Sequence, residues 1–385
     1  MIIYNKTWLA NAVIVGLAEE QNQQGLLSDT ELQAIRGKYP VGFYTPNIFI
    51  RIGLFLVTVI TAVCFERLVN LILFDSGLNP GYRLYLILGL LNYVALWLIV
   101  KKKSHYRSGV DDGLLLMSFI WLLISIEWLQ SDNYQARAIF IFLLSLYFAL
   151  RFSDMLMSCI SYLSLTAFLY FTWQKLGPTG ISTMPFALML YSGVIYLFVS
   201  RNISNIKTRF YVACMITIQV LTLITFYVAG NYFVVKEVGE ILNHTKNETM
   251  PLNWFFWIWT TMLPAFYVYR GIVRKDRISL RVGLLLCIAA AITVRHYYNL
   301  MPLELLFILT GIILIVLVWY VKKYLKTPRH GITDKEPAIE SLSDQLKLES
   351  LVISDSSSHI GIPPADTGTQ MGGGRFGGGG ASGTF

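Results

Sequence analysis

The chain has 385 residues, of which 55% are hydrophobic and 14% are charged, and its net charge at pH 7 is +8. Soluble domains usually carry about 25% charged residues, so this composition excludes an ordinary soluble protein and predicts a protein surrounded by membrane lipids. The positive charge does not indicate binding to nucleic acid, because the basic residues lie between long apolar runs, where they anchor loops.

Residues 1–47 precede the first long apolar run and carry the signals of a helical hairpin followed by a linker. Gly25 supplies a left-handed stop for the first helix. Ser28, followed three residues later by Glu31, predicts a capping box at the start of the second helix, and Gly37 predicts its end. We therefore interpret this region as a cytoplasmic hairpin.

An alternative for the same region is a cleaved signal peptide with residues 8–18 as its apolar core, although its basic segment would be a single lysine. The stretch GLLSDTELQAIRGKYP, followed by a membrane span, resembles a group of bacterial multi-span proteins of unknown function that place a short helix-turn-helix before their spans. The resemblance implies no active residue. It agrees with our prediction of a bacterial cytoplasmic (inner) membrane protein.

Residues 48–321 predict an all-α polytopic bundle of about ten transmembrane helices, because an apolar run of about 20 residues crosses a bilayer as a helix. The predicted spans are residues 48–65, 82–100, 113–129, 134–150, 155–173, 181–199, 210–229, 254–270, 279–294 and 303–321. With ten spans, the basic clusters at 101–107 and 270–281 lie on one face, which the positive-inside rule assigns to the cytoplasm together with both termini. Residues 230–253 become the longest outer loop.

Residues 322–385 form a polar tail that ends in GGGRFGGGGASGTF and is expected to be mostly disordered. This ending resembles the Gly-rich end of bacterial membrane proteins that carry a TPM domain, which commonly closes on an aromatic residue. One hypothesis is therefore that a cytoplasmic partner recognises the tail through its aromatic residues, Phe376 and Phe385. The alternative is an inert spacer.

Seven ionisable residues map near the outer ends of the predicted spans: Glu66, Arg67, Glu127, Arg137, Arg295, His296 and Glu304. Because an ionisable group in a membrane span is a functional hypothesis by default, one prediction is that they converge on an outward-facing polar vestibule for a small charged solute. The alternative is two interfacial ion pairs, Glu127 with Arg137 and Arg295 with Glu304, that close helical hairpins.

The sequence carries little that points to chemistry. The middle of the spans shows no acidic residue of the kind that a proton-coupled pump uses. The patterns HExxH, GxSxG, GxxxxGK[ST] and CxxC are absent, and the five histidines are scattered without a pair at ligand spacing. The sequence therefore predicts no catalytic residue, no metal site and no cofactor.

Three functions follow from these observations, and we place a non-enzymatic scaffold or accessory subunit first, with cytoplasmic protein partners at both termini. The second is a transporter or channel that uses the outer vestibule. The third is an enzyme acting on envelope lipids or glycans, which needs the outer charged residues to be catalytic. The sequence does not indicate an oligomeric state.

Overall fold

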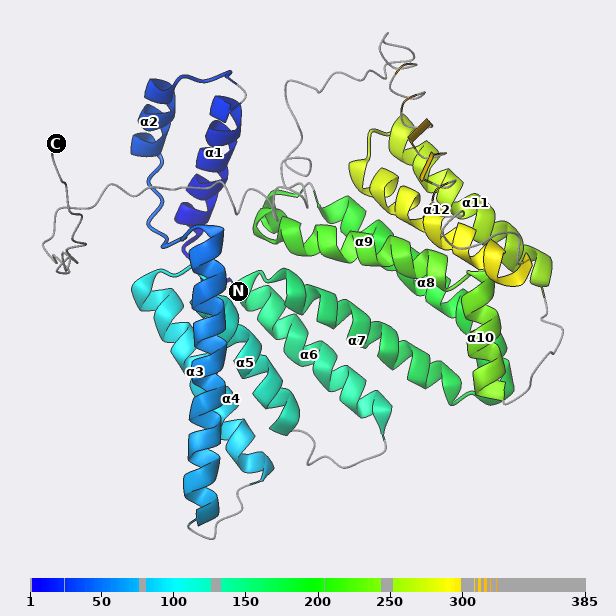
Figure 1. The fold of residues 1–385 in the computed structure, drawn as a ribbon, viewed down its shortest axis with the longest axis horizontal. Helices are drawn as coiled ribbons and strands as arrows, with labels where there is room; N and C mark the ends of the chain where they lie inside the picture. The colour runs from blue at the N-terminus through cyan, green and yellow to red at the C-terminus, as the bar shows by residue number, and fades with distance from the viewer. Residues whose placement is uncertain are drawn as a thin grey trace, which may run out of the picture.

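The computed structural model describes residues 2–23, 25–75, 81–125, 133–203, 205–243 and 252–298, with isolated positions between 308 and 323. This part of the chain is all-helical and contains no strand (Figure 1). Its helices are α1 (Lys6–Gln23), α2 (Asp29–Lys38), α3 (Ile48–Asp75), α4 (Tyr82–Lys103), α5 (Val110–Ile124), α6 (Tyr134–Phe152), α7 (Met155–Gln174), α8 (Gly177–Asn202), the 3-10 helix η2 (Ile206–Tyr211), α9 (Val212–Val228), α10 (Tyr232–Asn243), α11 (Asn253–Val273) and α12 (Arg277–Tyr298).

Seven of the described helices are long and apolar enough to cross a membrane, so the protein is a multi-pass membrane protein. They are Ile48–Leu73, Tyr82–Lys103, Tyr134–Phe152, Met155–Gln174, Gly177–Asn202, Thr208–Val228 and Arg277–Tyr298. The predicted count of about ten is not confirmed. Helix α5 is described over only 15 residues, and α11 is rich in tryptophan and tyrosine, which lower its hydropathy. The tenth predicted span, 303–321, lies outside the described residues except for isolated positions.

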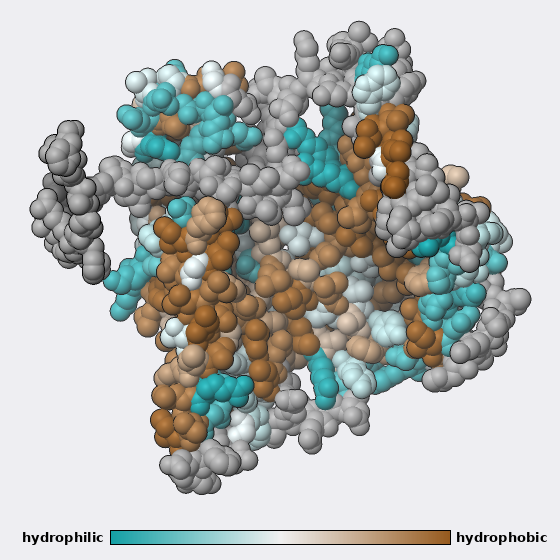
Figure 2. Space-filling model, in the orientation of Figure 1, coloured by the Kyte–Doolittle hydropathy of each residue, from teal (hydrophilic) through white to brown (hydrophobic). Residues whose placement is uncertain are grey.

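Helix α3 has an extended apolar surface that is not covered by the rest of the bundle. It is 28 residues long, about 42 Å at 1.5 Å per residue, against about 30 Å for a hydrocarbon core. Large apolar side chains are exposed along it, among them Phe49, Val57 and Leu71. Hydrophobic side chains accordingly cover the visible face over α3, whereas hydrophilic side chains gather on α1 and α2 (Figure 2). Such an extended apolar surface is suited to lipid and not to water.

Short connections make successive long helices antiparallel, so their ends fall at two ends of the bundle. We call the end at which α4 finishes with Lys101, Lys102 and Lys103 the basic end, and the opposite end the distal end. Helices α3, α5 and α7 begin at the basic end, where the side chain of Arg51 on α3 contacts that of Asp112 on α5. The most extensive helix contacts lie within the pairs α4–α5, α6–α7, α8–α9 and α11–α12.

The predicted helical hairpin is present as α1 and α2. Gly25 has φ +74°, and the capping box is complete: Ser28 Oγ accepts from the Glu31 amide at 3.3 Å, and Glu31 Oε2 accepts from the Ser28 amide at 2.9 Å. The expectation that Gly37 ends the second helix is wrong by one residue. The helix continues through Lys38, because the amide of Tyr39 still donates to the carbonyl of Ile35 at 2.9 Å.

The predicted outer loop 230–253 contains a helix that the sequence analysis missed. Helix α10 is amphipathic and, at 12 residues, too short to span a bilayer. Buried Asn231 holds its start: the Asn231 side chain donates to Tyr227 Oη at 2.9 Å and to Thr293 Oγ1 at 3.2 Å. The loop therefore begins with a helix that is tied to the distal ends of α9 and α12.

Candidate functional site

Glu66 and Arg67, two of the predicted vestibule residues, lie inside a continuous helix and not at its end, because α3 runs on to Asp75. Glu66 is only 4% exposed. Its carboxylate accepts hydrogen bonds from the side chains of Asn70 and Tyr85, the latter at 3.3 Å, and pairs with Arg67 Nε at 3.4 Å. The contacts of Glu66 therefore lie within α3 and α4.

Three more of the predicted residues, Arg137, Arg295 and His296, lie on other helices. The guanidinium of Arg137 lies 5.9 Å from the ring centroid of Tyr134, one turn away on α6. Arg295 and His296 lie in the last turn of α12, where the His296 ring packs against Phe233 on α10 at 4.9 Å. Helices α3 and α12 lie on opposite sides of the molecule in Figure 1.

Four of the predicted site residues, Glu127, Glu304, Phe376 and Phe385, lie outside the described residues. The single vestibule and the recognised tail therefore stay predictions. Of the described predicted residues, Glu66 and Arg67 lie on α3, Arg137 lies on α6, and Arg295 and His296 lie on α12.

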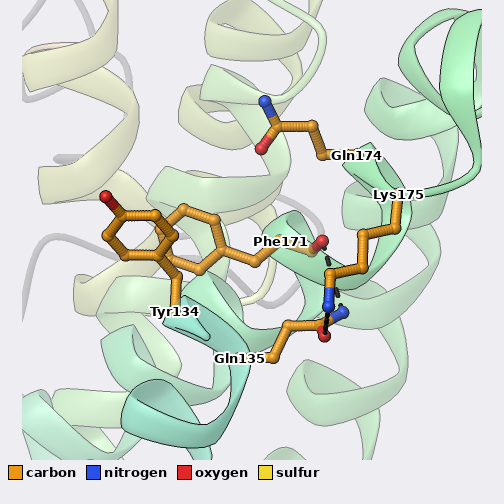
Figure 3. Close-up of a pocket in the computed structure, with 5 residues that line it drawn as sticks. All are labelled: Tyr134, Gln135, Phe171, Gln174 and Lys175. Carbon is orange, nitrogen blue, oxygen red and sulfur yellow. Dashed lines mark hydrogen bonds between the residues drawn. The ribbon is translucent and has the colours of Figure 1, made fainter. Parts of the chain in front are cut away.

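A small pocket lies at the distal end, between the start of α6 and the end of α7 (Figure 3). Tyr134 and Phe171 stack with centroids 5.3 Å apart along one side of it. Opposite them, Lys175 Nζ donates to Gln135 Oε1, and Gln135 Nε2 donates to the carbonyl of Phe171 at 3.4 Å. Its volume of about 120 Å³ is well below the roughly 300 Å³ at which ligand pockets begin. Lys175 and Gln135 bind each other, and the pocket is small, so it is a poor substrate site.

The larger candidate site lies at the basic end, where the sequence analysis assigned none. It is built at the starts of three helices: Arg51 and Asp112 lie in the first turns of α3 and α5, and Asp154 immediately precedes α7. Local sequence explains two of these starts. Asp154 caps α7, accepting from the Met157 amide at 2.8 Å. Asp111 closes the turn before α5 by accepting from the amides of Arg107 and Ser108, both at 2.8 Å.

Arg51 and Asp112 join α3 to α5. Arg51 Nε and Nη2 both approach Asp112 Oδ2, at 3.0 and 2.9 Å, so the contact leaves Asp112 Oδ1 outside the ion pair. Gly109 permits this approach: its φ is +90°, and a Cβ on it would lie 2.1 Å from the carbonyl oxygen of Arg51. Both charged side chains are about one-quarter exposed, so the pair is partly desolvated.

A cavity of about 320 Å³ opens at this ion pair, between α3, α5 and the start of α7. Arg51, Asp112 and Asp154 supply its charged wall, and the rest of its lining is apolar, including Ile52 and Phe55 from α3. Its volume lies at the lower edge of the range for ligand sites, about 300–1,000 Å³. A mostly apolar cavity with a few convergent charged groups has the composition of a binding site for an amphiphile.

The two acidic side chains of this site have raised pKa values. Asp112 precedes the predicted span 113–129, and burial together with the charge of Asp111 raises the pKa of Asp112 to about 6, against the opposing effect of Arg51. Burial also raises the pKa of Asp154, while the hydrogen bond from the Met157 amide opposes the rise. A proton or a second cation at the cavity would relieve the cost of holding two partly desolvated carboxylates.

His105, Ser108 and Asp111 are linked by hydrogen bonds near this site, but the order of these bonds is not that of a nucleophilic triad. Ser108 Oγ donates to Asp111 Oδ1 at 2.9 Å, and His105 Nδ1 lies 2.7 Å from the same hydroxyl, so the serine lies between the other two. Ser108 is fully buried, and burial lowers the pKa of His105. The arrangement closes a turn and offers no activated nucleophile.

The N-terminal segment packs over this end of the bundle. The amide of Ile3 donates to the carbonyl of Arg151 at 3.0 Å, and the Tyr4 ring packs edge-on against Tyr106 at 4.9 Å. Burial raises the pKa of Tyr4, and the nearby charges of Asp111 and Asp112 add to the rise. Tyr4 is therefore neutral at physiological pH and adds no charge to this end of the bundle.

The sequence contained a signal for this site. Arg51, Asp112 and Asp154 each stand in or next to the first turn of the first, third and fifth predicted spans. Those three starts share one side of the membrane in any arrangement of alternating spans, although the sequence does not show that they meet.

In the described ranges, no group of three or more His, Cys, Asp and Glu side chains is arranged to hold a metal ion. No family model, curated protein or solved structure matches the chain.

Proposed function

We propose that the protein is a non-enzymatic component of a bacterial cytoplasmic membrane, a scaffold or accessory subunit that presents its N-terminal hairpin to a cytoplasmic protein partner. The observation that supports this proposal is the way the hairpin is attached. A hairpin on a free linker would search many orientations, whereas a docked hairpin offers one surface and so lowers the entropic cost of binding.

Backbone hydrogen bonds attach the segments before and after the hairpin to the membrane helices and their connections. On the entry side, Ile3 bonds to Arg151 at the end of α6, as described above. On the exit side, the Tyr44 amide donates to the Ser104 carbonyl at 3.1 Å, and the Tyr106 amide donates to the Tyr44 carbonyl at 3.4 Å. The hairpin is thus held at two points, one on either side of its two helices.

Side chains reinforce this attachment. Leu9 and Phe43 belong to the same buried cluster as Leu96 of α4 and Leu114 of α5. Trp8 packs edge-on against Phe43 at 5.3 Å, so the hairpin and the membrane helices share one apolar core. Burying apolar side chains of this size stabilises a contact by about 1.5–3 kcal/mol each, which makes the docked state the stable one.

The hairpin carries three exposed apolar residues, Val13 and Ile14 on α1 and Leu26 in the turn. The visible surface of α1 and α2 is mostly polar (Figure 2). Exposed apolar side chains on a polar, fixed surface are typical of a protein–protein contact.

The test is purification from native membranes with quantification of co-purifying proteins. We expect the wild-type chain to bring down a partner in a fixed ratio, and a Val13→Glu/Leu26→Glu variant to lose it. A Thr30→Glu variant, also on the exposed part of the hairpin, serves as the control and keeps it. An equal partner ratio in all three proteins, with unchanged thermal unfolding, would exclude the hairpin as the docking surface.

A transporter or channel for a small solute is the second candidate, and buried Glu66 supports it, since an acid within a membrane helix is costly and commonly lies on a substrate path. Cysteine substitution at Asn70, beside Glu66, tests this possibility. Labelling of Asn70→Cys by an impermeant thiol reagent, slowed by added solute, would support a water-filled path. Absence of labelling would leave Glu66 as a structural contact between α3 and α4.

A further inference from the structure

The cavity at the basic end lies at the depth of lipid head groups. Arg51 is three residues from the start of α3, or about 4.5 Å along its axis, and Asp154 immediately precedes α7. The apolar lining continues one turn deeper to Phe55. Because α3 and α7 both qualify as membrane spans, the charged wall falls where a bilayer changes from head groups to acyl chains.

The cavity opens toward the side of the bundle that lipid would cover. Ile52 and Leu156, which line it, are 52% and 50% exposed, and Phe49 beside them is 82% exposed. A lipid molecule therefore reaches the charged wall sideways from the bilayer, with its acyl chains along the apolar surface of α3. A water-soluble ligand would have to displace lipid from the same rim.

Charge selects among the possible head groups. One guanidinium and two carboxylates line the cavity, so the wall carries one negative charge in excess when both acids are ionised. An anionic head group without an amine would be repelled, whereas an ammonium group neutralises the excess. Arg51 offers a partner for a phosphate, and carboxylate oxygens accept the three hydrogens of a primary ammonium better than they accommodate a quaternary one.

Two further charged groups lie near the wall, and their opposite charges offset each other. Asp111 lies next to Asp112 but accepts hydrogen bonds from the Arg107 and Ser108 amides, and it is only 3% exposed. The positive charge of Arg107 acts on Asp154 and opposes the rise of its pKa. Tyr4, packed above, stays neutral. A cavity of about 320 Å³ has room for a head group and not for a whole lipid.

We infer that this cavity binds the head group of a zwitterionic phospholipid with a primary ammonium group, such as phosphatidylethanolamine, placing the ammonium at Asp112 and Asp154 and the phosphate at Arg51. The bound lipid closes the gap between α3 and the start of α7. This inference goes beyond the scaffold role and does not depend on it.

The first test is native mass spectrometry of the purified full-length protein with added phosphatidylethanolamine, phosphatidylcholine or phosphatidylglycerol. We expect the first lipid to bind about tenfold more tightly than the other two, the size of effect that one charge-assisted hydrogen bond provides. The Asp112→Asn/Asp154→Asn variant should lose this preference. Asparagine also caps helices, so α7 keeps its start.

Asp29→Asn provides the matched control, because it makes the same chemical change on the hairpin, outside the cavity, and should leave the preference intact. Equal binding of the three lipids by the wild-type protein would overturn the inference. So would a preference that survives in the double variant.

A second measurement needs no variant. A carbodiimide joins a carboxylate to a nearby amine, so treatment of the wild-type protein in phosphatidylethanolamine vesicles should attach lipid to the peptide that contains Asp112 or Asp154. Peptide mass spectrometry identifies the position. Attachment only at exposed acids elsewhere, such as Asp29, would contradict the assignment of the ammonium to this cavity.

Discussion

At the scale of single residues, the basic end depends on how a few charges are buried together. Asp112 pairs with Arg51 but also lies next to Asp111, and the balance of burial, repulsion and attraction leaves its carboxyl group with a pKa of about 6 in place of 3.8. Its folded form therefore holds a proton more tightly than its unfolded form. An acid of this kind costs stability when it is ionised.

This balance predicts how stability varies with pH. The contribution of Asp112 to the free energy of unfolding should fall as pH rises from about 4 to about 6, because in this range the folded state still holds the proton and the unfolded state has lost it. Above pH 6 the contribution should stay level. Thermal unfolding in detergent of the wild type and of Asp112→Asn, measured from pH 4 to pH 8, gives this contribution as a difference. Since Asp154 is present in both proteins, its own titration cancels to first order. A difference that does not vary with pH would contradict the raised pKa.

Gly109 is the residue on which the contact of α3 and α5 depends most directly. Gly109→Ala forces a Cβ to within 2.1 Å of the Arg51 carbonyl at a φ of +90°, so we expect a loss of stability of about 2 kcal/mol or more. Gly53→Ala on α3 is the control, because nothing lies within 4 Å of its new methyl group. Detergent thermal unfolding should separate the two variants. Equal unfolding temperatures would show that α3 and α5 do not approach this closely.

At the scale of elements, α2 and α10 show two ways in which side chains fix the start of a helix. In α2 the decision is local, since Ser28 and Glu31 satisfy each other's backbone amides. In α10 it is tertiary, since Asn231 bonds to residues of α9 and α12. A helix start fixed by local residues, as in α2, can be predicted from a sequence, whereas a start fixed by tertiary contacts, as in α10, cannot.

The capping box gives a prediction for α2. Ser28→Ala removes the acceptor of the Glu31 amide and should cost about 1 kcal/mol of local stability. Hydrogen exchange of the α2 amides in the intact protein measures this loss, which should appear as faster exchange confined to that helix. Gln33→Ala, at an exposed position of α2, should leave exchange unchanged. Similar rates in both variants would mean that docking to the bundle, and not the cap, holds α2.

The tertiary anchor gives the corresponding prediction for α10. Asn231→Ala removes the hydrogen-bond partner of the buried Tyr227 hydroxyl, which should cost about 1–3 kcal/mol, whereas the Thr293 hydroxyl keeps its bond to the Ala289 carbonyl. We expect faster amide exchange throughout α10 and a lower unfolding temperature. Asn202→Ala, whose amide bonds only to its own helix at Phe198, is the comparison and should have little effect. Protection of α10 in the Asn231 variant would place its anchor elsewhere.

At the scale of the whole molecule, the proposed orientation rests on the basic end facing the cytoplasm. Single cysteines at Lys102 and Lys275, in a background without the four natural cysteines, should be labelled by an impermeant thiol reagent only after the cells are opened. A cysteine at Thr179, at the distal end, should be labelled in intact cells. The reverse pattern would invert the molecule and would place the hairpin and the head-group cavity on the outer side.

The sequence by itself determined the class of the protein. Apolar runs separated by basic loops require helices in lipid, because a backbone in hydrocarbon must satisfy its own hydrogen bonds. The hairpin of α1 and α2 could also be predicted from the sequence, since a capping box and a left-handed glycine each depend on residues only a few positions apart. The sequence singled out Glu66 only as one of seven ionisable residues near span ends. It could not indicate the contact of Glu66 with Tyr85 on the next helix, because the sequence says nothing about the rotation of one helix against another.

Only the tertiary structure decided which charges meet. Arg51, Asp112 and Asp154 stand far apart in the chain, and they line one cavity because three helices begin at the same end and Gly109 lets two of them touch. The same holds for α10, whose start depends on Asn231 finding Thr293 across the bundle. The hydrophobic pattern and the helix caps depend on residues that are close in the sequence, so they can be predicted from it. A site assembled between helices depends on their packing, which the order of residues leaves open.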